Sequence, residues 1–408
     1  MRNIRLYCFF IIISVIPNSL KSQTVYFSAA HVNLYEFIDE MSTAGIISTH
    51  SVVKPYSRSF IAGKLAEVAT KDSLLNKRQK AELAFHLKDF RKELATLADT
   101  LKKFQPFYFA YKDSFFTLCI KPVAGSYFYQ NSNGFMYQRW IGAEAFAYVD
   151  KHWGFYAGLR DYNENRAFSS PAYLELRQGF KYKNFTDYSE MKGGITYSWK
   201  WGHIGFVKDQ MIWGTNYNGS NLFSGRTPSF AQIRMKLHPV KWFEFNYVHA
   251  WIISEIADSN SRVFNGKIYL NRPKYLTANM FTFRPVQPLS LSFGNSIIYY
   301  DFDYPGYIIP TFFYKSLAHT NSVNGETVNA QLFFDASLRV FKRLHVYSTF
   351  FIDEVSMSNV FNKSKSTNFF SIKAGCAADN LPIKNMKLIV EYTRSNPLVY
   401  QHDVAMTT

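Results

Sequence analysis

Two hydrophobic periodicities divide the chain at about residue 105. Before this point apolar residues recur every three or four positions, as on one face of an α-helix, in the stretches 32–46, 55–70 and 74–101. The third stretch carries one apolar stripe, with Lys and Arg on its other side: Leu83, Leu87, Phe90, Leu94, Leu97 and Leu101. Residues 31–104 are therefore expected to form a small bundle of three helices, or to dock one helical face onto the C-terminal part of the chain.

After residue 105 the period becomes two, which is the period of a β-strand. In 141–149, apolar side chains occupy every second position: Ile141, Ala143, Ala145, Ala147 and Val149. The same alternation recurs at 153–160, 232–238, 331–340, 345–353 and 386–392. One side of these segments is continuously apolar and the other carries full charges, so each is predicted to be a strand with two different environments.

The lengths of the strands and loops indicate the kind of sheet. Strands of about 8 to 12 residues suit a tilted crossing of a membrane, whereas strands in soluble sheets are nearer 5–6 residues. Short turn signals alternate with long polar stretches at 163–190, 214–228, 255–266 and 318–326. Residues 105–408 are therefore predicted to form an all-β transmembrane barrel, antiparallel and up-and-down, with a soluble β-protein as the alternative.

The N-terminus has the pattern of an export signal. Arg2 and Arg5 precede an apolar run at 8–16, which is too short to span a bilayer, and Pro17 ends it. Polar and small residues come next, so 1–22 is predicted to be a secretory signal peptide cleaved after Ser22, with a buried N-terminal strand as the alternative. Beyond residue 22 there is no run of about 18 apolar residues, so no transmembrane helix is expected.

Composition narrows the function classes. The chain has 39 Phe, 28 Tyr and 7 Trp, which favours strands. Without Arg2, Arg5 and Lys21, the formal net charge of +16 becomes +13. These charges are scattered, whereas nucleic-acid binding usually needs a clustered basic face. An acidic polysaccharide or lipopolysaccharide fits this charge better; a generally basic surface is the alternative.

Motifs for catalysis are missing from the sequence. It contains no G-x-S-x-G, H-E-x-x-H or P-loop motif and no cysteine cluster, so the sequence offers little sign of catalysis or of a metal site. Cys119 and Cys376 are the only cysteines after residue 22, which excludes a disulfide framework and leaves one long-range bridge open.

Two polar segments are candidates for polysaccharide binding. The first offers amides and guanidinium groups as directional donors for sugar hydroxyls and carboxylates, and a tyrosine that could stack on a sugar ring: Arg160, Asp161, Tyr162, Asn163, Asn165 and Arg166. The alternative for this segment is an ordered network of hydrogen bonds at the rim of the barrel.

The second candidate is the long polar stretch at 211–230, which is too polar for lipid and too long for a tight turn. It contributes Trp213, which is suited to the aromatic girdle at a membrane interface, together with Asn216, Asn218, Asn221 and Arg226. We expect an extracellular or inward-folded loop that either binds the ligand or plugs the barrel.

Several stretches together resemble the capsule assembly proteins of the Wzi family, in the form found in the Bacteroidetes. A signal peptide, a helical bundle and a large barrel come in the same order. The similar segments are 35–47, 54–68 and 74–83 in the helical part, and 158–166, 213–237 and 391–402 in the barrel part. The resemblance covers most of the chain.

The resemblance implies a function and a location. Such proteins form barrels of about 18 strands in the outer membrane of Gram-negative bacteria. They bind capsular or other surface polysaccharide as lectins, help to attach it, are not enzymes and need no cofactor. Their helical bundle is thought to lie on the periplasmic side and to help block the barrel. An outer-membrane transport channel for a small solute is the alternative function.

The chain departs from the family pattern at two places. It has Arg226-Thr227-Pro228 where the family tends to carry Asn-Ala-Pro. It also ends in DVAMTT rather than on a strand, so either the chain is cut short or its end is atypical. Bulky residues on the expected inward face, Phe146, Tyr148 and Phe333, favour a filled interior over an open channel.

Overall fold

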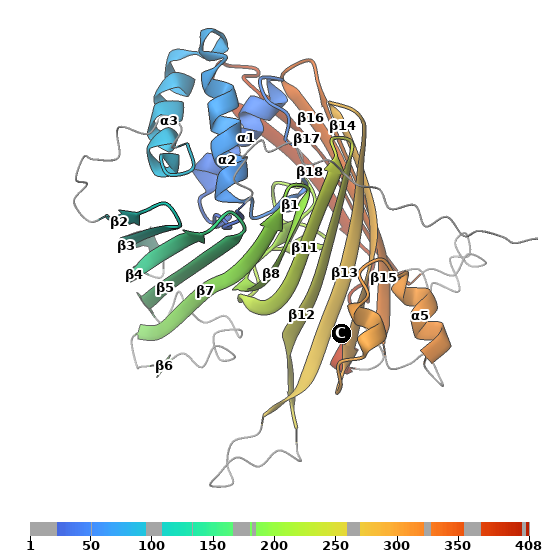
Figure 1. The fold of residues 1–408 in the computed structure, drawn as a ribbon. Coiled ribbons are helices and arrows are strands. Elements are labelled where there is room, and N and C mark those ends of the chain that lie inside the picture. The colour runs from blue at the N-terminus through green and yellow to red at the C-terminus, as the bar shows by residue number, and fades with distance from the viewer. Residues whose placement is uncertain are drawn as a thin grey trace, which may run out of the picture.

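Figure 1 shows the computed structural model of the chain. It describes residues 23–49, 51–94, 108–132, 134–165, 180–181, 185–258, 270–321, 328–354, 369–401 and 405–407. The predicted signal peptide, residues 1–22, and the candidate site residue Arg166 lie outside the described residues.

The N-terminal part forms the predicted helices, α1 (Val32–Thr43), α2 (Arg58–Ala69) and α3 (Lys77–Leu87). Two 3-10 turns accompany them, η1 (Asp72–Leu74) and η2 (Lys88–Phe90). The α-helix expected to run through 74–101 is thus shorter, because the chain tightens into η2 after Leu87. The start of α3 is fixed by a capping box between Asn76 and Gln79, which satisfies backbone N–H groups left free at a helix start.

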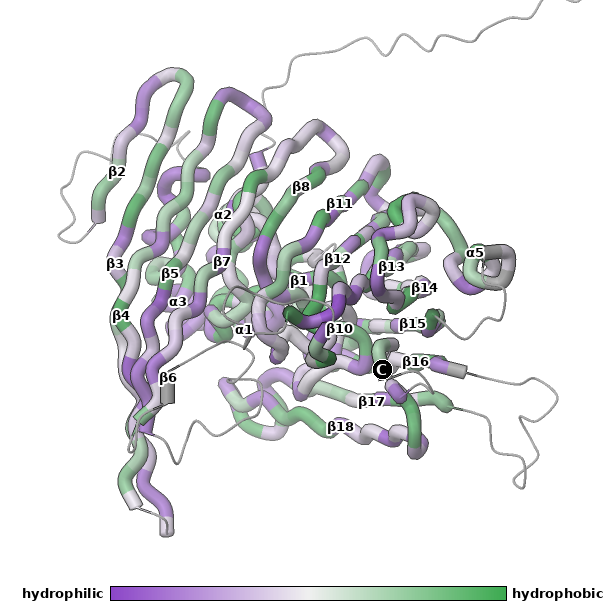
Figure 2. Tube along the Cα trace, turned by 90° about the horizontal axis from the view of Figure 1, so that it is seen from below, coloured by the Kyte–Doolittle hydropathy of each residue, from purple (hydrophilic) through white to green (hydrophobic). Residues whose placement is uncertain are grey.

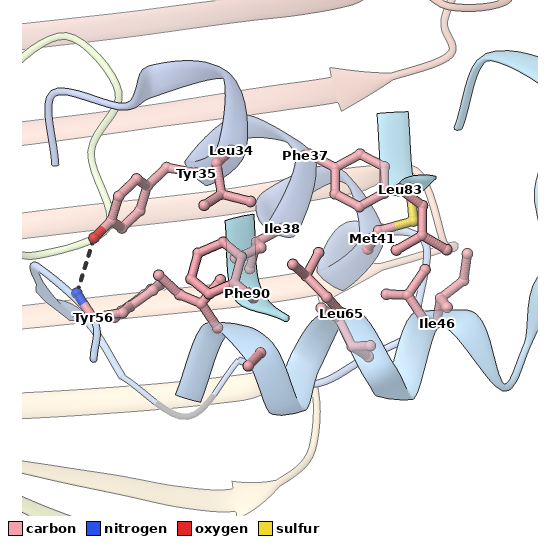
Figure 3. Packing of buried hydrophobic residues seen from close by; sticks show 14 of the residues in the cluster. Leu34, Tyr35, Phe37, Ile38, Met41, Ile46, Tyr56, Leu65, Leu83 and Phe90 are labelled. Atoms are coloured by element: carbon pink, nitrogen blue, oxygen red, sulfur yellow. Dashed lines mark hydrogen bonds between the residues drawn. The ribbon is translucent and has the colours of Figure 1, made fainter. Parts of the chain in front are cut away.

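The helical stripes bury their apolar side chains against one another (Figure 3). Met41, Ile61 and Leu65 have no exposed surface, and each such side chain contributes roughly 1.5–3 kcal/mol through burial. Tyr35 closes one end of this core, where its hydroxyl accepts a hydrogen bond from the backbone N–H of Tyr56 at 3.0 Å. We call residues 23–94 the helical block.

The following part of the chain forms a large antiparallel, up-and-down sheet, as predicted, in which neighbouring strands pair in sequence order except that β5 pairs with β7 and the short β6 pairs only with β7. Its 15 strands are β2 (Phe109–Lys112), β3 (Phe116–Asn131), β4 (Gly134–Val149), β5 (Trp153–Asn165), β6 (Phe180–Lys181), β7 (Phe185–Trp199), β8 (Gly202–Asp209), β11 (Phe230–Val240), β12 (Phe243–Ala257), β13 (Asn271–Val286), β14 (Leu289–Tyr300), β15 (Asn329–Val340), β16 (Leu344–Glu354), β17 (Phe369–Asp379) and β18 (Lys387–Ser395).

The sheet curves into an arc, with α1, α2 and α3 on its inner side in this view and α5 outside it (Figure 2). Its two ends are β2 and β18, and among the described strands no pairing joins them. The sheet is therefore open in this part of the chain, a point that the sequence left undecided. The short β2 pairs only with Thr117–Ile120 and leaves the remaining edge of β3 without a partner strand among the described residues.

The two faces of the sheet have opposite polarity. In β15 the outward Phe334 is 48% exposed, while the inward Asp335 and Ser337 are each 2% exposed. In β4 the outward Ile141 is 68% exposed, whereas the inward Glu144 pairs with Arg160 and Lys121. Apolar side chains outside and polar ones inside reverse the arrangement of a soluble protein and are typical of strands that face lipid. No helix in the described part of the chain combines the length and apolar character needed to span a bilayer.

The connections differ at the two ends of the sheet. Short turns such as 150–152, 200–201 and 287–288 lie at the end that carries the helical block (Figure 1). Gln23 attaches the block there, because its side-chain amide donates to the carbonyl of Asp150 at 2.5 Å. Most connections at the opposite end are long, with the tight β3–β4 hairpin as an exception. We call these the short-turn end and the long-loop end.

A small second sheet lies inside the arc (Figure 2). It joins β1 (Val53–Lys54) from the helical block to β9 (Ile212–Trp213) and β10 (Phe223–Ser224) from the long polar stretch. Residues 210–229, which we call the plug loop, therefore fold inward. The φ of +101° at Gly214 is in the left-handed region that glycine adopts readily, and it lets the backbone turn directly after β9.

One connection instead covers the outer face. The segment from η4 (Pro305–Ile308) to α5 (Tyr314–Asn321) packs against β13 and β14, where Tyr307 and Tyr314 meet Ile297 and Tyr299. Asn295 fixes its position by accepting a hydrogen bond from the backbone N–H of Tyr314 at 2.9 Å. This segment thus covers polar amide side chains, such as that of Asn295, on the outward face of the strands at the long-loop end.

Candidate functional site

The first candidate segment is part of a strand rather than a rim loop. Because β5 continues to Asn165, its side chains alternate between the two faces. Arg160 and Tyr162 point inward, whereas Asp161, Asn163 and Asn165 belong to the outward face. The predicted polar cluster is therefore divided between two surfaces.

The outward members bind neighbouring strands. Asp161 accepts a hydrogen bond from the hydroxyl of Ser189, and Asn163 accepts one from Arg139 at 3.0 Å. The side-chain amide of Asn163 also donates to Asp187. This outward polar patch lies near the long-loop end of β4, β5 and β7, and it corresponds to the ordered network that the sequence left open as an alternative.

The inward members join a row of aromatic rings. Trp140 on β4, Tyr162 on β5 and Tyr188 on β7 lie directly opposite one another in the strand register. The ring centroids of Trp140 and Tyr162 are 6.1 Å apart, and those of Tyr162 and Tyr188 are 4.9 Å apart with an interplanar angle of 8°. Tyr127 extends the row at 5.1 Å from Trp140, and it is 54% exposed. Such cross-strand contacts stabilise the row.

Gly125 makes room for this row. A Cβ atom at Gly125 would lie 2.2 Å from the indole of Trp140, so a side chain there would push the ring away. The Trp140 ring consequently lies against the backbone of β3.

Polar groups flank the aromatic row on both sides. On the long-loop side, the amide of Gln138 donates to Glu164 at 2.8 Å and to the hydroxyl of Tyr188 at 3.3 Å. On the other side, Glu144 binds Arg160 at 2.7 Å and Lys121 at 3.4 Å. We call this surface the inner wall: Lys121, Tyr127, Gln138, Trp140, Glu144, Arg160, Tyr162, Glu164 and Tyr188.

The inner wall combines flat aromatic surface with a few directional amide, guanidinium and carboxylate groups, as ligand sites commonly do. The sequence reasoning found Arg160 and Tyr162 but missed Trp140, Tyr188, Tyr127 and Gln138. Only the register of β3, β4, β5 and β7 brings these residues together.

A cavity of about 80 Å³ adjoins the inner wall on its short-turn side. The wall contributes Lys121, Glu144 and Arg160, and the helical block contributes Tyr26 and His31. Burial lowers the pKa of His31, the nearby carboxylate of Glu144 acts in the opposite direction, and Lys121 and Arg160 act with burial. The imidazole is therefore neutral at pH 7 and offers one donor and one acceptor to this cavity.

The second candidate segment, the plug loop, is held by the sheet. The indole of Trp213 is 2% exposed and packs edge-on against Phe333, with ring centroids 6.0 Å apart. Trp213 therefore lies in the interior core, so its predicted place in an aromatic girdle is wrong, and it is not accessible to a polysaccharide. A tryptophan after a strand has the same local sequence signature in either place, because the inward fold of the loop depends on distant contacts.

Asparagines of the plug loop contact strands β16 to β18. The amide of Asn216 donates to the Thr349 hydroxyl at 3.0 Å, and the backbone N–H of Asn218 donates to Glu391 at 3.0 Å. Lys373 donates to the carbonyl of Asn218 at 3.1 Å. These contacts are those of a plug, the second of the two roles expected for this loop.

The other two polar candidates of the loop are placed differently. Asn221 is 9% exposed, and its carbonyl accepts a hydrogen bond from the Tyr400 hydroxyl at 3.1 Å. Arg226 is exposed, and its backbone N–H donates to the Ser224 hydroxyl at 3.3 Å. The structure does not bring Arg226 onto the inner wall.

A buried carboxylate ties the helical block, the plug loop and the sheet together. Asp39 on α1 pairs with Arg339 of β15 and with Lys387 of β18, the latter at 2.9 Å. It also accepts a hydrogen bond from the hydroxyl of Tyr217 in the plug loop. Burial alone would raise the pKa of Asp39, but the charges of Arg339 and Lys387 outweigh it and hold that pKa well below its ordinary value.

The described part of the chain contains no group of three His, Cys, Asp or Glu side chains arranged to hold a metal ion. Cys119 and Cys376 are both free cysteines. Cys119 is buried beside Phe146 and Tyr148, inside the arc.

Comparisons with known proteins give solved structures of similar fold. No protein-family model matches the chain, and no curated protein matches it. The chain is similar to Wzi, an outer-membrane protein involved in group 1 capsule assembly in Escherichia coli and a carbohydrate-binding β-barrel. Identity is 13%, and 95% of this chain and 76% of that chain are covered at a TM-score of 0.45. Pseudomonas aeruginosa OpdQ is similar at 13% identity, with 71% of this chain and 74% of that chain covered at a TM-score of 0.35. Structural similarities with 13% sequence identity and TM-scores of 0.45 and 0.35 do not define a function.

Proposed function

We propose that this chain is an outer-membrane protein that binds a capsular or other surface polysaccharide and helps to hold it at the cell surface. The inner wall is the observation that carries this proposal. Its aromatic row offers apolar surface to the C–H faces of sugar rings, and Gln138 and Arg160 offer hydrogen bonds to hydroxyl and carboxylate groups.

The two faces of the sheet support a place in the outer membrane. The outward face exposes apolar side chains such as Ile141 and Phe334, which hydrocarbon would cover. In barrels of this class the short turns face the periplasm and the long loops face outward. The helical block then lies on the periplasmic side, and the inner wall opens toward the extracellular side.

The filled interior favours binding over transport. The plug loop and the helical block occupy the inside of the arc and are held by buried ion pairs and by the core around Trp213. A polymer can contact the inner wall without passing through. The polysaccharide would be retained by many weak contacts along its length, because its repeating units raise the local concentration of ligand at the protein. The basic composition of the protein favours an acidic polymer.

The test uses the folded full-length protein in detergent and the surface polysaccharide of its source bacterium. Binding is followed by titration calorimetry, and the same sample is placed in planar bilayers. The proposal predicts saturable binding and no stepwise conductance. Conductance steps without binding would contradict it and assign the protein to the transport class, in which a small solute passes an open interior.

A further inference from the structure

A second cavity lies at the short-turn end, between the helical block, the plug loop and the sheet. Its volume is about 50 Å³, which is room for several water-sized groups. Asp39 of α1, Lys54 of β1, Thr215 of the plug loop and Arg339 of β15 are among its lining residues. Three parts of the molecule therefore meet at one polar cavity.

Positive charge exceeds negative charge around this cavity. Lys54, Arg284 and Arg339 line it, against the single carboxylate of Asp39. That carboxylate is already bonded to Arg339, Lys387 and the Tyr217 hydroxyl. The nearby carboxylate of Glu244 acts on Arg284, so Lys54 is the lining cation that still needs a balancing negative charge.

Lys54 is the cation with the least compensation. Its ammonium lies 5.5 Å from the centre of the Tyr35 ring, and among the described residues that ammonium has no hydrogen bond or ion pair. Burial lowers the pKa of Lys54, the charge of Asp39 opposes this, and the charges of Arg339 and Lys387 add to it. A bound anion would supply the missing negative charge.

A buried hydroxyl group without a hydrogen-bond partner in the described structure supports a bound anion independently. Ser290 of β14 lines the cavity, is 9% exposed, and its Oγ has no hydrogen-bond partner in the described structure. Buried polar groups normally have a partner, so an unsatisfied one beside a cationic cavity calls for an acceptor within that cavity.

We infer that this cavity binds a small oxyanion, a phosphate, sulfate or carboxylate group, with Lys54 and Ser290 as donors and with Arg284 and Arg339 adding positive charge. Oxyanions match both features of the cavity, because each oxygen accepts several hydrogen bonds and carries negative charge. Space for several water-sized groups also suits one tetrahedral anion.

The bound anion would stabilise the attachment of the helical block and the plug loop to the sheet. It would contact the helical block through Lys54 and the sheet through Ser290, beside the plug loop at Thr215. A ligand that binds only this assembled arrangement stabilises it by mass action. This site lies on β14 and β15, whereas the inner wall lies on β3, β4, β5 and β7, and it does not depend on polysaccharide binding.

The probe is inorganic phosphate, added to the full-length protein in detergent micelles at constant ionic strength with chloride as the replacement. The melting temperature is followed by tryptophan fluorescence, and affinity is measured by titration calorimetry. The wild type should show a saturable rise in melting temperature. Parallel titration with acetate compares a carboxylate source with a phosphate source, and saturable binding of either one supports the inference.

Variants separate the site from general charge screening. Lys54→Gln should weaken phosphate binding at least about tenfold, and Ser290→Ala should weaken it about three- to tenfold, because each removes one donor to a charged acceptor. Lys200→Gln removes the same charge from an exposed turn at the same end and should bind as the wild type does. If Lys54→Gln does not fold, Ser290→Ala decides.

Three results would overturn the inference. The first is a wild type that binds neither phosphate nor acetate saturably. The second is phosphate binding that Ser290→Ala and Lys54→Gln leave unchanged. The third is phosphate binding that Lys200→Gln weakens as much as they do.

Discussion

The carboxylate of Asp39 should control how firmly the helical block is attached. Asp39→Asn keeps the size of the side chain but removes the charge that pairs with Arg339 and Lys387. Those two cations then remain close together with no carboxylate between them. We expect the helical block to open far more often from the sheet, while the sheet itself stays folded.

The size of this effect can be worked from the burial of the three side chains. Asp39, Arg339 and Lys387 are 17%, 18% and 23% exposed, so most of each side chain is shielded from water. Breaking a buried ion pair costs about 3–5 kcal/mol, and the residual exposure reduces this to about 2–4 kcal/mol. Since every 1.4 kcal/mol is a factor of ten, opening should increase about 30- to 1,000-fold.

Hydrogen–deuterium exchange of α1 measures this opening directly. The matched control is Glu36→Gln, which removes an exposed carboxylate from the same helix and should change exchange little. Equal exchange rates in α1 of Asp39→Asn and Glu36→Gln would refute the role of Asp39.

The same carboxylate gives a pH dependence with a defined sign. Because the folded pKa of Asp39 is held well below its ordinary value of 3.8, its stabilisation is complete above that ordinary value. It is lost as pH falls through the folded pKa. Exchange of α1, corrected for the intrinsic rate, should therefore be constant above about pH 5 and rise only below about pH 4; a rise already at pH 6 would contradict this.

Three further substitutions test the core, the outer face and the aromatic row. Trp213→Ala should lower the free energy of unfolding by about 3–5 kcal/mol in a denaturant titration, because it empties the interior core, whereas Trp201→Ala in an exposed turn should change it little. Phe334→Arg should destabilise the protein in lipid vesicles by about 2–4 kcal/mol if the outward face contacts hydrocarbon, and a neutral result would place that face in water. Gly125→Ala should displace the Trp140 ring, change its fluorescence and weaken polysaccharide binding, and unchanged fluorescence would refute the close contact.

The elements with strong periodicity could be predicted from the sequence. The stretches 32–46 and 55–70 contain α1 and α2, because their apolar stripes and caps are local signals. The alternation in 141–149 correctly placed Ile141 outside and Phe146 inside. These features depend on residues close together in the chain.

The candidate site was less predictable because it depends on register and on distant contacts. The segment 160–165 was interpreted as a cluster, but the continuation of β5 to Asn165 sends alternate residues to opposite faces. Tyr217 and Asp39 are 178 residues apart, so no local pattern could reveal that the loop folds inward onto the helical block. Trp140 and Tyr188 became candidates only when pairing placed them opposite Tyr162.

Polysaccharide binding by a Tyr162→Ala variant tests the proposed role of the inner wall most directly. The control is Phe155→Ala, an aromatic residue on the outward face of the same strand. Loss of an aromatic contact of about 0.5–1.5 kcal/mol should weaken binding about two- to tenfold for each sugar contact, and more for a polymer. We predict weakened binding by Tyr162→Ala and wild-type binding by Phe155→Ala; unchanged binding by Tyr162→Ala would contradict the assignment of the inner wall.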